Sequence, residues 1–203
     1  MAHMATTIDS WPPRSTGLIE PCTARLQLRQ WQASDRAPFA ALTADPDVMR
    51  YFPAPLTRAQ SDAMADKIEA LIAQQGWGLW AVALRSTGAF AGFVGLHVPA
   101  AALPFQPCVE IGWRLARPAW GQGIATEAAT AALAVAFGPL QLPEVVSFTT
   151  RSNLPSQAVM QRLGMARDLA GDFLHPDLPA QHPLQPHVLY RLSAPQRPSP
   201  PRL

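Results

Sequence analysis

Residues 110–137 read EIGWRLARPAWGQGIATEAATAALAVAF. The stretch 109–115 alternates apolar with other side chains as a strand does, and the alanine-rich run up to Phe137 predicts a helix. Between them lies a short turn with Gly121 and Gly123, which allow backbone dihedrals that a Cβ would resist. A strand, a glycine turn and a helix N-terminus together suit a phosphate or pyrophosphate, because the first N–H groups of a helix have no partner within it.

Two common phosphate-binding motifs do not fit this turn. A P-loop needs a lysine directly after its second glycine, and the only lysine of the chain is Lys67. A dinucleotide fingerprint needs a third glycine, where Thr126 stands, and an acidic residue about 20 residues further on at the end of the next strand. Glu144 instead opens that strand. What remains is a backbone cradle for a pyrophosphate carried by another ligand.

A second motif follows the next predicted strand. Residues 153–165 read NLPSQAVMQRLGM. Asn153 can cap a helix, Pro155 suits its first turn, and Gly164 suits the left-handed position at its exit. Capping explains these three residues, but it does not explain Ser156 or the spacing to the glycine turn.

The two motifs, in this order and with one strand between them, resemble the Gcn5-related N-acetyltransferases, the GNAT family. Residues 120–125 are similar to the family's acyl-CoA-binding signature, Arg/Gln-x-x-Gly-x-Gly/Ala. Trp120 departs from the first position of that signature, as is typical of the branch resembling RimJ and RimL, the ribosomal-protein alanine and serine N-acetyltransferases. Residues 153–165 resemble the family's second CoA-contacting element, and the resemblance extends from about Arg25 to Leu192.

Hydrophobic periodicity predicts the order of elements that the family uses. We therefore expect an α/β fold, a single GNAT-like domain whose mixed central sheet of about seven strands is splayed at the middle, with about four helices on both faces. Strands are expected over 25–31, 77–85, 90–98, 109–115, 144–151, 165–172 and 187–192, and helices from Ser34 or Asp35 to Leu42, over 58–75, up to 137 and over 153–163.

The domain is expected to cover residues 23–193. Residues 1–22 show no periodicity and are interpreted as a loose N-terminal leader, with a possible cloning scar at 1–3. Residues 194–203 are rich in proline, which predicts a C-terminal tail that frays.

Composition limits the classes of partner that we expect for this protein. The formal net charge is only +2, so no nucleic-acid partner is expected. No apolar run approaches the roughly 20 residues of a membrane span, so no membrane partner is expected either. Cys22 and Cys108 show no metal or redox spacing and are expected to be free thiols, which fits a cytoplasmic protein without a metal. The oligomeric state is left open between a monomer and a homodimer.

The resemblance implies acetyl-CoA as cosubstrate, bound where two neighbouring parallel strands, 109–115 and 144–151, move apart. Backbone groups at the gap would bond the pantetheine amides, because the sheet leaves them unpaired. The implied CoA-binding residues are Trp113 and Leu115 at the gap, then Trp120, Gly121, Gln122, Gly123, Ile124, Ala125 and Thr126 in the turn, and Asn153, Ser156 and Arg162 in the second motif.

The reaction needs an acid for the leaving thiolate and a base for the amine. Ser156 is the first candidate for the acid and Tyr190 the second, although a plain first-turn serine and a half-buried strand tyrosine are the alternative interpretations. Glu110 is the first candidate for the base, because a carboxylate in mid-strand needs a partner or a function. The alternative there is a cross-strand salt bridge to an arginine, and Asp172 is the second candidate base.

The implied function is transfer of an acetyl group from acetyl-CoA to a primary amine by direct attack in a ternary complex. The acceptor could be a protein N-terminus or a small molecule, and the alternative is a non-catalytic acyl-CoA-binding or sensor protein of the same fold. The acceptor pocket is expected between residues 48–53 and 174–187. Tyr51, Phe52, Trp77 and Trp80 could line it, and Asp45 and Asp47 could attract a cationic amine.

Overall fold

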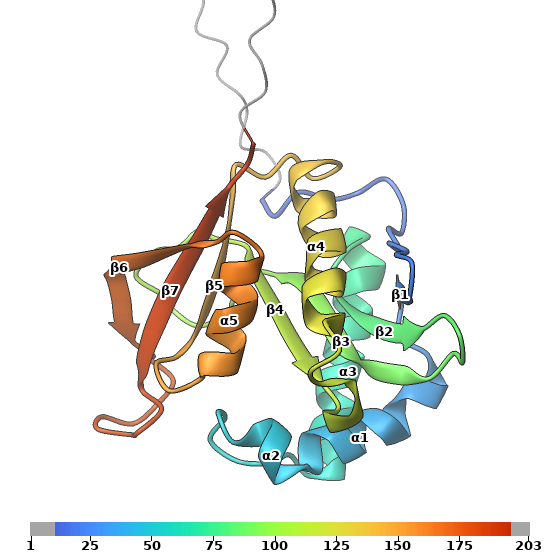
Figure 1. Ribbon diagram of the computed structural model, residues 1–203, viewed down its shortest axis with the longest axis horizontal. Coiled ribbons are helices and arrows are strands. Elements are labelled where there is room, and N and C mark those ends of the chain that lie inside the picture. Colours follow the sequence, from blue (N-terminus) through green and yellow to red (C-terminus); the bar gives the residue numbers. More distant parts are fainter. Residues whose placement is uncertain (1–10, 196–203) are drawn as a thin grey trace, which may run out of the picture.

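A mixed sheet of seven strands forms the centre of the computed structural model, which describes residues 11–195 (Figure 1). Its strands are β1 (Leu26–Arg29), β2 (Leu79–Leu84), β3 (Phe90–His97), β4 (Glu110–Leu115), β5 (Glu144–Thr150), β6 (Ala166–Leu174) and β7 (Pro186–Ser193). The helices are α1 (Arg36–Ala44), α2 (Pro46–Met49), α3 (Arg58–Gln75), α4 (Ile124–Phe137) and α5 (Leu154–Arg162), with 3₁₀ turns η1 (Ala33–Asp35) and η2 (Arg117–Ala119).

The strand order is β1-β2-β3-β4-β5-β7-β6, and the only parallel pair in the described residues is β4 with β5. These two strands pair only at Glu110 and Val146 and then diverge (Figure 1). The splayed α/β sheet expected from the sequence is therefore confirmed.

Helices cover both faces of the sheet. Helices α4 and α5 lie on one face, and α1 and α3 lie on the other (Figure 1). Helix α4 can approach the sheet closely because its inward side chains are small. The fully buried ones are Ala128, Ala129, Ala132 and Ala136.

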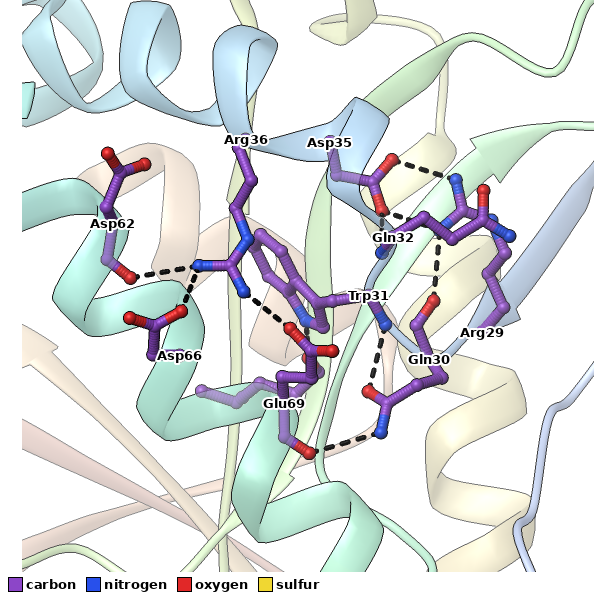
Figure 2. A network of polar contacts seen from close by, with 10 residues as sticks. Arg29, Gln30, Trp31, Gln32, Asp35, Arg36, Asp62, Asp66 and Glu69 are labelled. Carbon is purple, nitrogen blue, oxygen red and sulfur yellow. Dashed lines mark hydrogen bonds and ion pairs between the residues drawn. The ribbon is translucent and has the colours of Figure 1, made fainter.

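A polar network joins the end of β1 to η1, α1 and α3 (Figure 2). Arg29 of β1 makes a buried, two-pronged ion pair with Asp35, at 2.6 and 2.8 Å. Arg36 at the start of α1 reaches Asp66 and Glu69 of α3. The side chain of Asp35 does not cap α1, because its carboxylate accepts hydrogen bonds from Arg29 and from the backbone N–H three residues before it.

The prediction of a loose leader is wrong for residues 11–22. The indole of Trp77 donates to the carbonyl of Pro13, and the indole of Trp80 donates to the carbonyl of Ile19, both at 2.7 Å. Both tryptophans are fully buried, so they belong to the core and not to an acceptor pocket. The possible scar at 1–3 and most of the proline-rich tail lie outside the described residues.

Local signals at helix ends are confirmed. Thr57 caps α3 in a capping box, and Gly76 ends it in the left-handed region at φ +83°. No helix was expected directly after α1, but Asp45 caps a short helix there, α2, and its carboxylate accepts from the N–H of Asp47. Neither cysteine of the chain is paired; Cys22 is exposed and Cys108 is buried.

Candidate active site

The gap between β4 and β5 begins just after Glu110 and Val146, the residue pair that joins the two strands. The N–H of Val146 donates to the carbonyl of Val109 at 3.0 Å. At the next step along β4 the hydroxyl of Ser147 takes the place of a backbone donor and bonds the carbonyl of Ile111 at 2.9 Å. Because alternate residues of a strand point their backbone groups to the same side, Trp113 also faces the gap, beyond the reach of the β5 ladder. Ser147 was not among the residues expected from the sequence.

The glycine turn lies beside the open end of this gap, where α4 begins (Figure 1). Gly121 and Gly123 have φ values of +71° and +76°, in the left-handed region that favours glycine. The indole of Trp120 donates to the carbonyl of Leu115 at 2.8 Å, which holds the turn against the end of β4. Ile124 is buried beneath the turn, so the cradle consists of backbone N–H groups.

Gln122, Ala125 and Thr126 complete this cradle. Ala125 and Thr126 lie in the first turn of α4, whose N–H groups lack helical partners and carry the positive end of the helix dipole. The amide of Gln122 donates to the carbonyl of Pro118, so this side chain stabilises the turn.

An arginine from the opposite end of the chain reaches the turn. Arg25 donates to the carbonyl of Gln122 at 3.0 Å and pairs with Glu127 of the first turn of α4 at 2.6 Å. Burial opposes the ionised carboxyl, but hydrogen bonds from Thr23 and Arg25 outweigh it and lower the pKa of Glu127. Sequence reasoning missed Arg25, since nothing in the local pattern places it near residue 122.

The second motif forms the other side of the gap. The side chain of Asn153 accepts from the N–H of Ser156 at 3.3 Å, as a cap does. Its amide donates to the hydroxyls of Thr149 and Ser156 at 2.9 and 3.0 Å. The Ser156 oxygen thus accepts one hydrogen bond, and within the described residues its own proton has no acceptor. Arg162 is exposed at the other end of α5, about 13 Å away along the helix, so the structure does not bring it to the same place.

Glu110 lies on the face of β4 opposite to Trp113. It forms a cross-strand ion pair with His97 of β3, with Oε2 and Nε2 at 2.9 Å. The partner is therefore a histidine and not the arginine that the sequence suggested. Burial opposes protonation of the imidazole, but the Glu110 charge and hydrogen bond outweigh it, so the pKa of His97 is raised above its ordinary value.

This pair predicts a pH-dependent part of the stability. A histidine whose folded pKa is raised stabilises the fold fully below its unfolded pKa of about 6.5, and this contribution is lost as the pH rises through the folded pKa. We expect the free energy of unfolding to fall over that window in the wild type and to fall less in His97→Gln. Chemical denaturation at about pH 6 and about pH 9 measures it, with His182→Gln, in the loop between β6 and β7, as control. An identical fall in His97→Gln would contradict the assignment.

The second candidates for acid and base lie elsewhere. The hydroxyl of Tyr190 contacts Gln157 and Gln161 of α5, and the ring is buried beneath that helix. Asp172 is bound by Arg167 through two oxygens at 2.5 and 2.7 Å. Both geometries favour structural roles, because each polar group already has its partners within the fold.

An aromatic cluster flanks the Glu110 side of the sheet. The rings of His175 and His187 are 4.9 Å apart, and burial lowers the pKa of His187. The phenylalanines that pack with them are Phe105, Phe148 and Phe173. The segment 174–187 thus contributes His175 and His187 to this aromatic cluster.

The expected acidic attraction for a cationic amine is not found. Asp47 pairs with Arg117 at 2.6 Å, and Asp45 is used as the cap of α2. Within the described residues there is also no cluster of three or more side chains suited to a metal ion. No helix in residues 11–195 is long and apolar enough to cross a membrane.

Comparison with known proteins decides the family. The family model of the acetyltransferase (GNAT) domain matches residues 25–166. This chain belongs to the GNAT acetyltransferase family. It is an acyltransferase, and the family to which it belongs uses acetyl-CoA.

Individual relatives are similar to this chain over most of its length. YkkB of Bacillus subtilis is 33% identical over 144 residues, which cover 70% of this chain and 83% of YkkB. The crystal structure of an acetyltransferase from Agrobacterium tumefaciens has a TM-score of 0.70 and 28% identity, with 88% of this chain and 96% of that chain covered. A RimL ribosomal L7/L12 α-N-protein acetyltransferase in complex with coenzyme A has a TM-score of 0.68 over 86% of this chain and 97% of its own, at 17% identity, which shows the shared fold.

Proposed function

We propose that this GNAT enzyme transfers the acetyl group of acetyl-CoA to a primary amine, by direct attack of the amine in a ternary complex. The observation that carries the proposal is the gap between β4 and β5, flanked at its open end by the N-termini of α4 and α5 (Figure 1). Unpaired backbone groups in a sheet are costly, so a ligand that satisfies them fits this gap.

The residues present fit coenzyme A. The N–H groups from Gly121 to Thr126 would hold the pyrophosphate, with Arg25 as a nearby positive charge. The backbone of Trp113 would bond the pantetheine, whereas the Leu115 carbonyl is already taken by Trp120. When bound, acetyl-CoA supplies the thioester whose acyl group is transferred.

Different groups around the gap would serve as oxyanion donor, base and acid. The N–H of Trp113 would donate to the thioester oxygen as negative charge develops there. Glu110, held by His97 on the other face of β4, would take the proton of the amine, directly or through water. The free proton of Ser156 would be donated to the sulfur that leaves.

Two classes of acceptor amine are compatible with this arrangement. One is a protein N-terminus, which the branch resemblance at Trp120 and the RimL-like fold favour. The other is a small-molecule amine, which the aromatic wall of Phe148, Phe173 and His175 could enclose.

Acetyl-CoA consumption with release of free thiol, measured across peptides with varied N-termini and a panel of small amines, tests the proposal. Thiol release that depends on one acceptor class supports it and names the class. Tight acetyl-CoA binding by calorimetry without release for any acceptor would contradict transfer to these amines.

Ser156→Ala is expected to lower kcat by about tenfold with little change in acetyl-CoA affinity. The effect is modest for general acid catalysis because a thiolate leaves readily without full protonation. Ser152→Ala, in the exposed turn before α5, is the matched control. Unchanged kcat in Ser156→Ala, in an assay limited by chemistry, would return Ser156 to the role of a plain first-turn serine.

A further inference from the structure

Arg114 is a half-buried cation for which the described residues provide no counter-ion. Its Nε and Nη1 atoms are shielded from solvent, and no described residue accepts a hydrogen bond from them. Burial lowers the pKa of Arg114 to about 10, so the guanidinium still carries its charge at neutral pH. A buried charged group of this kind is costly to the fold unless something pairs with it.

Two aromatic rings contact this guanidinium. Its carbon lies 3.9 Å from the centre of the Phe52 ring and 5.5 Å from that of Phe93. Such contacts stabilise a cation partly, but the N–H groups of Nε and Nη1 still lack an acceptor among the described residues. The stacking holds the planar group in one orientation, which is the preparation that two-pronged recognition of an oxyanion needs.

The carboxylates of β4 and of the segment just before Phe52 are already engaged. Glu110, on the same face of β4, pairs with His97. On the segment across from Arg114, Asp47 pairs with Arg117, and Asp45 caps α2. An anion for Arg114 therefore has to come from outside the fold.

Arg114 lies where the acceptor would enter. It directly follows Trp113, whose backbone faces the gap, and its side chain points to the opposite face of the sheet. The ring that covers it, Phe52, belongs to the segment after α2 that is expected to line the acceptor pocket. A second cation, Arg50, sits on that segment over Tyr51, 4.7 Å from the ring centre, and 5.9 Å from the ring centre of Trp120.

We propose that Arg114 binds an oxyanion, a carboxylate or a phosphate, of the acceptor, so that the preferred substrate is an amine that also carries an acidic group. This inference rests on the proposed transfer to an amine and specifies its substrate class. Phe52 covers the bound anion, and Arg50 attracts it at the entrance. The amine at the other end of the acceptor lies near Glu110, on the same face of β4.

Matched pairs of acceptors test the inference. Each pair shares one amine and differs in the anion: amino acids against their amides, peptides with Asp or Glu against Asn or Gln at the second position, and amino sugars with and without a phosphate. We expect the wild type to prefer the anionic member by about 10- to 100-fold in kcat/KM, the effect of hydrogen bonds to a charged group. The type of pair that shows the largest preference separates a carboxylate from a phosphate.

Arg114→Met keeps an unbranched side chain between the two rings and removes the charge. Its expected result is loss of the preference through a higher KM for the anionic member, with kcat for the neutral member and the calorimetric affinity for acetyl-CoA unchanged. Arg114→Lys, a point charge without the planar fork, is expected to keep part of the preference. Arg117→Met, which removes a cation already paired with Asp47, is the control and should keep all of it.

Equal rates for both members of every pair in the wild type, or a preference that survives Arg114→Met, would overturn the inference while leaving the acetyltransferase intact. Absence of transfer to any acceptor would instead contradict the proposed function. A melting temperature of Arg114→Met at or above that of the wild type shows that the variant is folded, as expected when an unpaired buried charge is replaced by an apolar side chain.

Discussion

Gly123→Asp is expected to weaken acetyl-CoA binding by about 100-fold or more, since charge-assisted hydrogen bonds to a phosphate are lost and a like charge is added. Gly123 is the N-cap of α4 at φ +76°, so a side chain there strains the turn. The nearest atom to an added Cβ is Nη2 of Arg25, at 3.6 Å. The new carboxylate would pair with Arg25 and remove this cation from the cradle. Calorimetric titration with acetyl-CoA measures the effect.

Gly88→Asp is the matched control. Gly88 lies in the turn between β2 and β3 at φ +74°, with no atom within 4 Å of an added Cβ. Both variants place aspartate in the left-handed region, so both carry a strain of about 1 kcal/mol, but only Gly123→Asp changes the cradle. Equal acetyl-CoA affinity of Gly123→Asp and Gly88→Asp would show that the pyrophosphate does not bind at this turn.

Glu110→Gln is expected to lower kcat/KM by about 10²- to 10⁴-fold, the range for a general base. It should also flatten the acid limb of the pH–rate profile, because the carboxylate that must be ionised is gone. The amide can still accept a hydrogen bond from His97, so the fold is retained. Initial rates from about pH 5 to about pH 9, over a range of concentrations of an acceptor identified by the panel, measure both effects.

Glu144→Gln makes the same chemical change in a carboxylate that pairs with Arg191 at the start of β5, and it should leave the profile as in the wild type. An acid limb that is unchanged in Glu110→Gln would place the base elsewhere.

The chain order and both motifs were predictable because their signals are local. Thr57 and Gly76 define the ends of α3 through bonds within one turn of the helix. Asn153 caps α5 in the same way. The alternation of β4 also placed Glu110 and Trp113 on opposite faces, since a strand has a period of two.

Several interpretations failed where the outcome depended on distant partners. Trp77 and Trp80 were considered for an acceptor pocket, but they are buried by residues 11–22, whose own sequence shows no periodicity. Asp45 and Asp47 were considered as attractors of a cation, but α2 and Arg117 use their charges. In each case the side chain type was compatible with either role, and only the tertiary neighbours distinguished them.

The sequence by itself determined the strands, the four longer helices, their order, the glycine turn at 120–126 and the capped helix at Asn153, because each depends on contacts among residues a few positions apart. Only the tertiary structure decided the pairing of Glu110 with His97, the isolation of the Arg114 charge, and the approach of Arg25 to Gln122 across 97 positions of the chain. Such pairings follow from strand register and from which helix covers which face, and these are set by burial of the whole core rather than by any local pattern.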